Sequence, residues 1–233
     1  MRNQRLHDSG RERKVFIMAT RYHATGVQTE FETGSRGRVL RNLLGISRLR
    51  DMQQAESQAL QLAQRRAIGI YSENQQFIAR DVQALHRLWL SPIYAWAGEY
   101  RAVNIGKRGF QFASANLIPG LMAKFERNEL AQHTPCVPGP DRVVAGSLAI
   151  VHAELVLIHP FRDGNGRVAR LLALLMGLQA GLPPLDFSPL DGRGRNLYIA
   201  GIQAALDRDY GTLNWLFERV IARTRRNASS SRR

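Results

Sequence analysis

The segment from His159 to Arg170 holds side chains whose types and spacing suit chemistry on a phosphate. It reads His159-Pro160-Phe161-Arg162-Asp163-Gly164-Asn165-Gly166-Arg167-Val168-Ala169-Arg170. A base, a carboxylate, two glycines, an amide and guanidinium groups therefore lie within one short stretch. Packing alone rarely requires so many polar groups together, so this segment is the candidate functional site.

The middle of the segment is typical of an anion-binding turn. Gly164, Asn165 and Gly166 stand just before a predicted helix, where glycines let backbone N–H groups turn toward an anion that also feels the helix dipole. Arg167 and Arg170 are three residues apart on that helix, so both guanidinium groups project from one face and can each bind phosphate oxygens. Two such groups fit a polyphosphate better than a monophosphate.

The two remaining polar groups suggest a reaction rather than simple binding. His159 ends the preceding helix, and an imidazole is well suited to take a hydroxyl proton near neutral pH. Asp163 precedes the turn and can bind a hard divalent cation, most plausibly Mg²⁺ bridging phosphate oxygens. The sequence therefore predicts His159 as a general base and Asp163 as a metal ligand.

Apolar periodicity predicts a mainly α-helical chain that positions this segment. A long helix should begin after Ser47 as its cap, and a second should run from about Ala79 to a stop before Pro92. Helices are also expected over 141–158, after the motif up to Gly181, over 197–206 and over 213–221. Ser114 should cap another helix, with Pro119 tolerated near its first turn. Alternation across 100–112, interrupted by Gly106-Lys107-Arg108-Gly109, predicts a β-hairpin.

The segment resembles the Fic-domain signature HxFx(D or E)GNGRxxR throughout. The resemblance extends more weakly over about residues 40–220, including Asn42-Leu43-Leu44-Gly45-Ile46 and Trp96-Ala97-Gly98-Glu99-Tyr100-Arg101. It implies a Fic fold, a mainly α helical bundle with one β-hairpin flap beside the active site. The expected division is an N-terminal extension over 1–40 that is partly extended or disordered, a Fic domain over 41–222 and a disordered basic tail over 223–233.

The same resemblance implies transfer of AMP from ATP to a Ser, Thr or Tyr hydroxyl of a target protein, with Mg²⁺ as cofactor. It assigns His159 as base, Asp163 as Mg²⁺ ligand, Gly164 to Gly166 as the anion site, and Arg167 and Arg170 as β- and γ-phosphate contacts. Tyr198 could stack near the adenine, although a core tyrosine is an equal interpretation. The flap, which in the family pairs with the target as a strand, would consist of Ile105, Gly106, Lys107, Arg108, Gly109, Phe110, Gln111 and Phe112.

Charge and composition bear on whether the protein binds nucleic acid, spans a membrane or is secreted. The formal net charge is +14, but much of the excess lies in Met1–Lys14 and Arg219–Arg233, where solvated tails are the simpler explanation. No apolar run is long enough to cross a bilayer, and the one after the basic N-terminus is too short for a secretory signal. A single cysteine, Cys136, fits a reducing cytoplasm, unless the protein is delivered into a host cell by a route that the sequence does not show.

Fic proteins are often silenced by a helix with (S or T)xxxE(G or N), whose glutamate pairs with the second motif arginine, here Arg170. Of the ten glutamates only Glu73 is followed by Gly or Asn, and Gly69 stands four residues before it. The chain thus lacks this pattern, which favours a toxin-like protein restrained by a separate antitoxin.

Two alternatives stay open. Fic proteins with altered motifs transfer phosphate, UMP or phosphocholine, although the intact Gly164-Asn165-Gly166-Arg167 run favours ATP and AMP transfer. The second alternative is a basic nucleic-acid-binding protein with a vestigial motif. The basic residues lack the interleaved aromatics of single-strand binders and no zinc or helix-turn-helix pattern is present, so direct nucleic-acid binding is not favoured.

Overall fold

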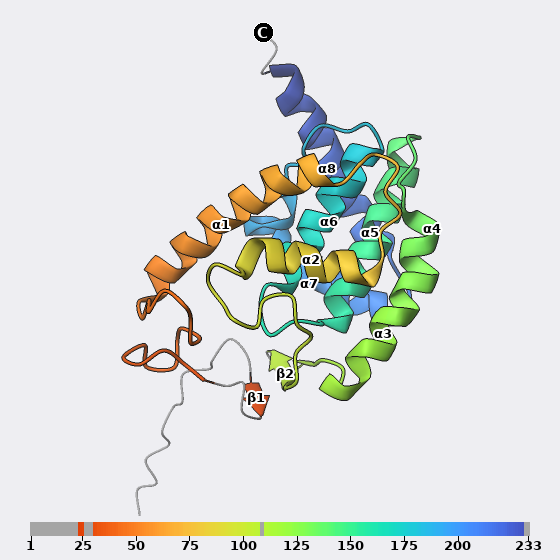
Figure 1. The fold of residues 1–233 in the computed structure, drawn as a ribbon. Helices are drawn as coiled ribbons and strands as arrows, with labels where there is room; N and C mark the ends of the chain where they lie inside the picture. The colour runs from red at the N-terminus through yellow and green to blue at the C-terminus, as the bar shows by residue number, and fades with distance from the viewer. Residues whose placement is uncertain (1–22, 26–29, 108–109, 231–233) are drawn as a thin grey trace, which may run out of the picture.

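The protein is a helical bundle with a small antiparallel sheet at one end (Figure 1). The computed structural model describes residues 23–25, 30–107 and 110–230. Its α-helices are α1 (Leu49–Ile70), α2 (Ala79–Leu90), α3 (Ile118–Phe125), α4 (Ala131–His133), α5 (Asp141–Ile158), α6 (Asn165–Gln179), α7 (Arg195–Ala204) and α8 (Gly211–Ser230). Its strands are β1 (His23–Thr25), β2 (Asn104–Lys107) and β3 (Phe110–Gln111). Shorter turns of 3₁₀ or π helix are η2 (Ala115–Leu117), η3 (Glu126–Leu130), η4 (Ser188–Leu190), η5 (Gly192–Gly194) and η6 (Ala205–Asp207).

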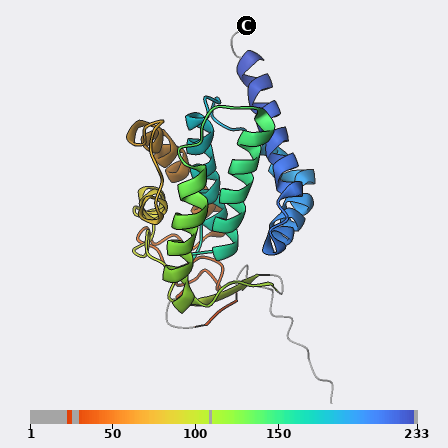
Figure 2. The same ribbon diagram turned by 90° about the vertical axis from the view of Figure 1, so that its right-hand side faces the viewer.

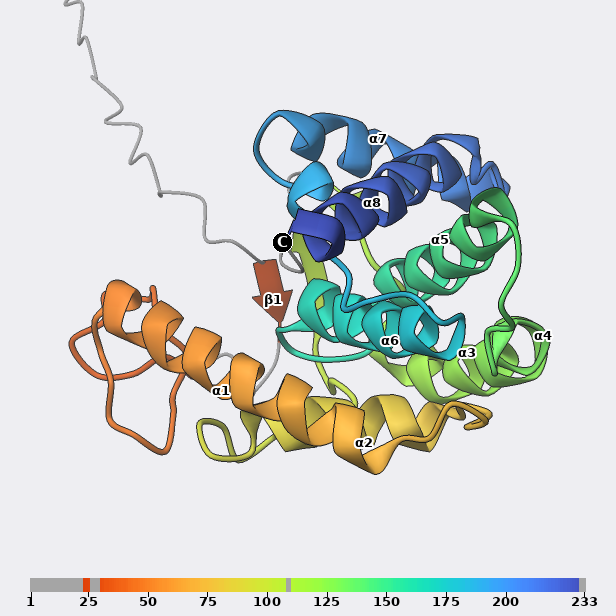
Figure 3. The same ribbon diagram turned by 90° about the horizontal axis from the view of Figure 1, so that it is seen from above.

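The helices form three layers, which are clearest when the bundle is seen from above (Figure 3). Helices α1 and α2 lie on one side, α7 and α8 on the other, and α5 and α6 lie between them. Most residues of the two middle helices are buried, as expected for helices that are apolar on nearly every face. The candidate motif joins these two helices, so it is held by the buried middle layer of the bundle.

A second, smaller core lies between α1, α2 and the chain that precedes them. Met52, Ala63, Trp89 and Leu90 are buried there together with Val39. Val39 belongs to a loop closed by an antiparallel bridge between Phe31 and Leu40. The folded domain therefore begins before residue 41, and residues 30–40, expected as part of a loose extension, help to build its core.

Most helices lie where the apolar pattern predicts them. Helix α2 spans Ala79–Leu90, α5 spans Asp141–Ile158, and Pro119 occupies the first turn of α3. The expected cap at Ser47 is wrong, because the N-cap of α1 is Arg48 in an extended conformation with no side-chain hydrogen bond. Near this end of α1, Met52 is buried in the core that the helix shares with α2.

The C-terminal prediction also needs correction. Helix α8 continues to Ser230, so residues 223–230 are helical and not the disordered tail that their basic composition indicated. Buried Thr224 accepts a hydrogen bond from the Asp186 N–H, and Arg225 pairs with Asp141. The tertiary contacts of this turn stabilise a helix that charge counting alone does not reveal.

The sheet lies at one end of the bundle, below the helices in the side view (Figure 2). Strand β2 pairs antiparallel with β3, with Gly106 opposite Gln111, which confirms the predicted hairpin. Strand β1 from the N-terminal region pairs antiparallel with the other edge of β2, with Ala24 opposite Ile105. The sheet thus has three strands in the order β1-β2-β3. Within the described ranges, no helix combines the length and apolar character needed to cross a membrane.

The buried histidines predict that acid destabilises the protein. Burial lowers the pKa of His86 to about 4 and that of His152 to about 3. In the unfolded chain a histidine has a pKa of about 6.5. Between these values the unfolded state binds more protons than the folded state, so stability is complete above the unfolded value and falls as the pH drops through this window.

The free energy of unfolding, measured by urea denaturation, should therefore decrease steadily from pH 7 to pH 5, above the range where carboxylates titrate. A His86→Gln, His152→Gln double variant should show a flatter dependence over the same range. An unchanged free energy between pH 7 and pH 5 in the unaltered protein would contradict the prediction.

Candidate functional site

His159 lies at the end of α5, where the chain turns sharply into the motif. Its backbone adopts the left-handed conformation with φ 53° and ψ 58°, which is costly for a residue with a Cβ and is found where the surroundings impose it. The Nδ1 atom lies 3.0 Å from the carbonyl oxygen of Val156. Because a carbonyl only accepts, Nδ1 carries the proton and the lone pair of the neutral ring is on Nε2. This is the tautomer that a general base requires.

The imidazole is buried under the flap. The ring of Phe112 stacks on it with 3.7 Å between ring centroids and an angle of 18° between the planes. Burial lowers the pKa of His159 to about 4, opposed by the Val156 carbonyl and reinforced by Lys107. The ring is therefore neutral at pH 7 and able to accept a proton.

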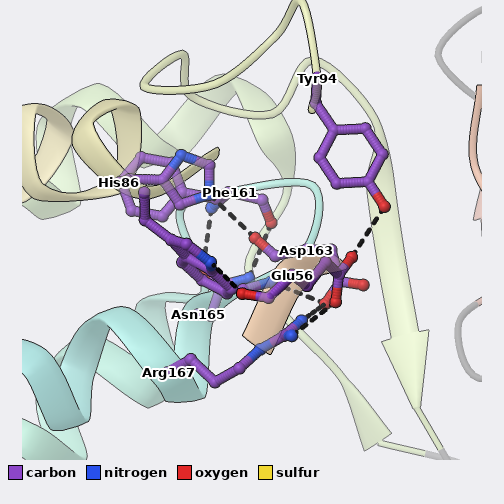
Figure 4. Close-up of polar contacts among 9 residues, drawn as sticks. Glu56, His86, Tyr94, Phe161, Asp163, Asn165 and Arg167 are labelled. Carbon is purple, nitrogen blue, oxygen red and sulfur yellow. Dashed lines mark hydrogen bonds and ion pairs between the residues drawn. The ribbon is translucent and has the colours of Figure 1, made fainter. Parts of the chain in front are cut away.

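The loop after His159 is closed by hydrogen bonds from Asn165 (Figure 4). Its side-chain oxygen accepts from the Phe161 N–H, and its side-chain nitrogen donates to the Phe161 carbonyl, both at 2.8 Å. His86 stacks on Phe161 at 3.9 Å and its Nε2 donates to the Asp163 carbonyl at 3.0 Å. Asn165, predicted as an ATP ligand, thus uses its side chain to shape the loop, and only its backbone faces the anion site.

The start of α6 has the form of an anion site. Gly164 is the N-cap with φ 86°, and its N–H donates to its neighbour, the Asp163 carboxylate. The N–H groups of Asn165 and Gly166 have no hydrogen-bond partner within the part of the chain that the structure describes. A Cβ built on Gly166 meets nothing within 4 Å, so space is open beside these donors. Two unsatisfied donors at the positive end of a fifteen-residue helix favour a bound phosphate.

Arg101 joins the flap to His159. Its buried side chain donates to the carbonyls of His159 at 2.7 Å, Val103 at 2.8 Å and Ala113 at 2.6 Å. Its backbone N–H also donates to the Pro160 carbonyl. Burial lowers the pKa of this guanidinium. The guanidinium contacts the backbone at both ends of the hairpin and the backbone of His159. Flap and base therefore hold a fixed relation to each other.

The two predicted phosphate contacts each pair with a carboxylate. Arg167 binds Glu56 of α1 at 2.6 Å and lies 3.7 Å from Asp163. Arg170 binds Asp191 through both terminal nitrogens, at 3.1 and 2.9 Å. Arg167 contacts the side of the bundle formed by α1 and α2, whereas Arg170 contacts the side that holds Asp191 and α7. The partner of Arg170 is not Glu73, which is the only glutamate of the sequence followed by Gly or Asn as in the inhibitory pattern.

Asp163 suits a metal site in which the ligand's phosphate oxygens and water complete the coordination, rather than one built from protein side chains alone. Its carboxylate is partly exposed and held by the Gly164 N–H and by Arg167. The described residues contain no group of three or more His, Cys, Asp or Glu side chains that could hold a metal ion. Mg²⁺ commonly binds through one or two carboxylates, with phosphate oxygens and water completing its shell. One carboxylate beside an anion site therefore fits that ion.

The flap residues lie beside the base as predicted, with one change in how their edge is used. Ile105 is buried, and Phe110 packs against Phe112 with 5.1 Å between ring centroids. The predicted flap residues Arg108 and Gly109 lie outside the described residues. Strand β1 pairs with the edge of β2 on the side opposite β3. A peptide that added to this edge of β2 would have to take the place of β1.

Tyr198 has the contacts of a partly buried core residue. Its hydroxyl lies 2.8 Å from His152 Nε2 on α5, and its ring packs at the margin of the main core. The guanidinium of Arg170 lies 5.9 Å from its ring centroid. The residue therefore adjoins the motif through Arg170, and its hydroxyl is used within the fold.

Several side chains that build the site were not identified from the sequence. They are Glu56, His86, Trp89, Tyr94 and Arg101, and all lie far from the motif along the chain. Only the segment Trp96 to Arg101 gave a signal in the sequence, through its resemblance to the Fic pattern.

Together the site offers an oriented neutral imidazole, an open helix N-terminus, two arginines and one carboxylate. This combination suits attack of a hydroxyl on a phosphorus atom.

Residues 76–176 match the Fic/DOC family. Curated relatives include protein adenylyltransferase Fic of Drosophila melanogaster, 27% identical over 194 residues, which covers 77% of this chain and 37% of that protein. Protein adenylyltransferase fic-1 of Caenorhabditis elegans is 47% identical over 57 residues, covering 24% of this chain and 11% of that protein. The chain thus spans well under half the length of these relatives.

Solved structures show the same fold. The BepC protein of Bartonella tribocorum with bound AMPPNP superposes with a TM-score of 0.67 at 21% identity, covering 83% of this chain and 96% of that one. The N-terminal Fic domain of a cell filamentation protein from Bartonella quintana with bound ADP gives 0.66 at 24% identity, covering 82% and 95%. The fold and the motif define a Fic domain. Residues 76–176, which contain the motif, thus resemble the Fic/DOC family within a chain that has the fold of Fic domains.

The two glycines of the anion site should respond differently to substitution. A Cβ on Gly164 would lie 2.7 Å from the Trp89 ring, and its φ of 86° disfavours any side chain, whereas Gly166 has open space. Gly164→Ala should therefore lower the free energy of unfolding by about 1–3 kcal/mol from backbone strain alone. Gly166→Ala is the matched control and should unfold close to the unaltered protein in urea. Equal stabilities of the two variants would contradict this reading of the turn.

Proposed function

We propose that the protein transfers AMP from ATP to a hydroxyl side chain of a target protein. The observation that carries the proposal is the tautomer of His159, whose Nδ1 is committed to Val156 beside the open N-terminus of α6. The match of residues 76–176 to the Fic/DOC family and the naming of the chain's relatives as protein adenylyltransferases support the same reaction.

In this reaction the triphosphate lies across the start of α6. The target hydroxyl oxygen attacks the α-phosphorus, and its proton passes to Nε2 of His159. The bond between the α-phosphorus and the oxygen that bridges to the β-phosphate breaks, and pyrophosphate leaves. The N–H groups of Asn165 and Gly166 stabilise charge on the transferring group, while Arg167 and Arg170 bind the β- and γ-phosphates. Catalysis then rests on positioning and electrostatics, without a covalent enzyme intermediate.

Asp163 would hold Mg²⁺ in the proposed complex. When bound, the ion would supply charge neutralisation on the phosphate oxygens. The contribution of the chain is to hold the Asp163 carboxylate at the mouth of the anion site through the Gly164 N–H.

Restraint of the reaction is proposed to come from a separate antitoxin-like protein. The (S or T)xxxE(G or N) pattern is lacking in the sequence, and Arg170 pairs instead with Asp191, whose side chain is 59% exposed. A solvent-exposed pair of this kind contributes little energy, so a nucleotide or a partner's carboxylate can displace it. The proposed setting is a cytoplasm that supplies ATP.

The role of His159 predicts a selective loss of transfer. His159→Ala should lower the rate of AMP transfer about 10²- to 10⁴-fold, since it removes the proton acceptor, while binding of an ATP analogue persists. The measurement is incubation with a cell extract and ATP labelled on the α-phosphate, followed by mass spectrometry of modified proteins. Label from the γ-phosphate, or an added mass of phosphate, UMP or phosphocholine, would overturn AMP transfer.

The third strand predicts that the N-terminal segment competes with target docking. Target peptides are proposed to pair with the flap as an added strand, and β1 occupies one edge of β2. Deletion of residues 1–29 should raise the rate of target modification at low target concentration and leave binding of an ATP analogue unchanged. A lower rate with intact folding would show that β1 supports the flap instead.

A further inference from the structure

Glu56 is a buried carboxylate on the outermost helix of the fold. It lies in the first half of α1, and its side chain is only 8% exposed. Glutamate is rarely buried to this extent unless it is paired. Its partner is Arg167, 111 residues later in the sequence, at 2.6 Å. The residue therefore links α1 directly to the anion site.

The carboxylate of Glu56 is held at both oxygens. Oε1 accepts a hydrogen bond from the Tyr94 hydroxyl at 2.7 Å, and Oε2 accepts from Arg167 Nη1 (Figure 4). The Trp89 indole N–H donates to the Glu56 carbonyl at 2.9 Å, and the Arg167 guanidinium lies over the Trp89 ring at 4.5 Å from its centroid. The Glu56 carboxylate, itself held by the Tyr94 hydroxyl, and the face of the Trp89 ring thus fix the Arg167 guanidinium in position and plane.

We infer that Glu56 is a positioning residue, which acts through Arg167 to orient the polyphosphate of the nucleotide; this inference rests on the proposed function. A guanidinium carries five N–H donors in a fixed plane and can bind a carboxylate and phosphate oxygens at once. Fixing one edge against Glu56 and one face against Trp89 determines where the other donors point. An arginine without these supports would have to order its long side chain when the nucleotide binds, at a cost in entropy.

The ion pair between Glu56 and Arg167 could instead inhibit nucleotide binding by neutralising Arg167. The geometry argues against that role. A restraint must move aside when the nucleotide binds. The backbone of Glu56 is held by α1, whose Met52 and Ala63 are buried in the second core, and its carboxylate is also held by the Tyr94 hydroxyl. The pair between Arg170 and Asp191 is the contrasting case, since Asp191 is exposed and lies in a loop. Glu56 is built into the fold, whereas Asp191 can leave.

Glu56→Ala and Glu56→Gln test the inference. Each should weaken binding of an ATP analogue and raise KM for ATP by about ten- to a hundredfold, as misplacement of an orienting group commonly does. Tyr94→Phe should act in the same direction with a smaller effect. Asp51→Asn, which removes an exposed carboxylate from the same helix, is the matched control. Tighter binding or faster transfer in the Glu56 variants would establish a restraint and overturn positioning.

A double-substitution cycle separates positioning from a general structural role. If Glu56 acts through Arg167, Glu56→Ala should cause no further loss of nucleotide affinity when Arg167 is already alanine. Additive losses would show that Glu56 acts elsewhere and would overturn the inference. Thermal unfolding of each variant confirms that the measured protein is folded. If the unaltered protein binds nucleotide but transfers no AMP, the proposed function fails while the affinity cycle still decides the role of Glu56. Absence of nucleotide binding would overturn both.

Discussion

The site depends on the hydrogen bonds by which Asn165 closes the loop between α5 and α6. One amide satisfies both backbone groups of Phe161. Because this loop is closed by a side chain, the first N–H groups of α6 remain available at its N-terminus. The closed loop also places His159 in a left-handed conformation at the end of α5, which turns its imidazole toward the same point. His159 and the N-terminus of α6 therefore form one structural unit.

Surrounding elements hold this unit from three sides. Arg101 donates to the backbone of His159 and to both ends of the flap, and His86 holds Phe161 and the carbonyl of Asp163. On the third side, α1 reaches Arg167 through Glu56. The chemistry is concentrated in twelve residues, but its geometry is distributed over the whole fold, including the N-terminal part that lies outside residues 76–176.

The two arginines of α6 show how similar sequence positions can have different environments. Arg167 faces a buried carboxylate fixed by Tyr94, and Arg170 faces an exposed one. Removal of a carboxylate that is buried with its partner leaves an uncompensated charge, whereas loss of an exposed pair costs little. The first arginine is thus preorganised and the second adjustable, which suits the proposed function, in which one part of a nucleotide is held firmly while the remainder enters and leaves.

The sequence by itself determined the motif, the helices around it and the hairpin, because these depend on local patterns: glycines before a helix, arginines three residues apart, and apolar positions at helical spacing. It also predicted the family from residues His159 to Arg170. Only the tertiary structure decided the partners of those residues. Glu56 and His86 gave no local signal because their roles are contacts across 111 and 77 residues of chain. The extension of α8 to Ser230 and the pairing of β1 with the flap likewise follow from long-range contacts. Such contacts bury apolar groups and supply hydrogen-bond partners to polar groups that the isolated segment would leave in water, so they can outweigh the preference that composition indicates.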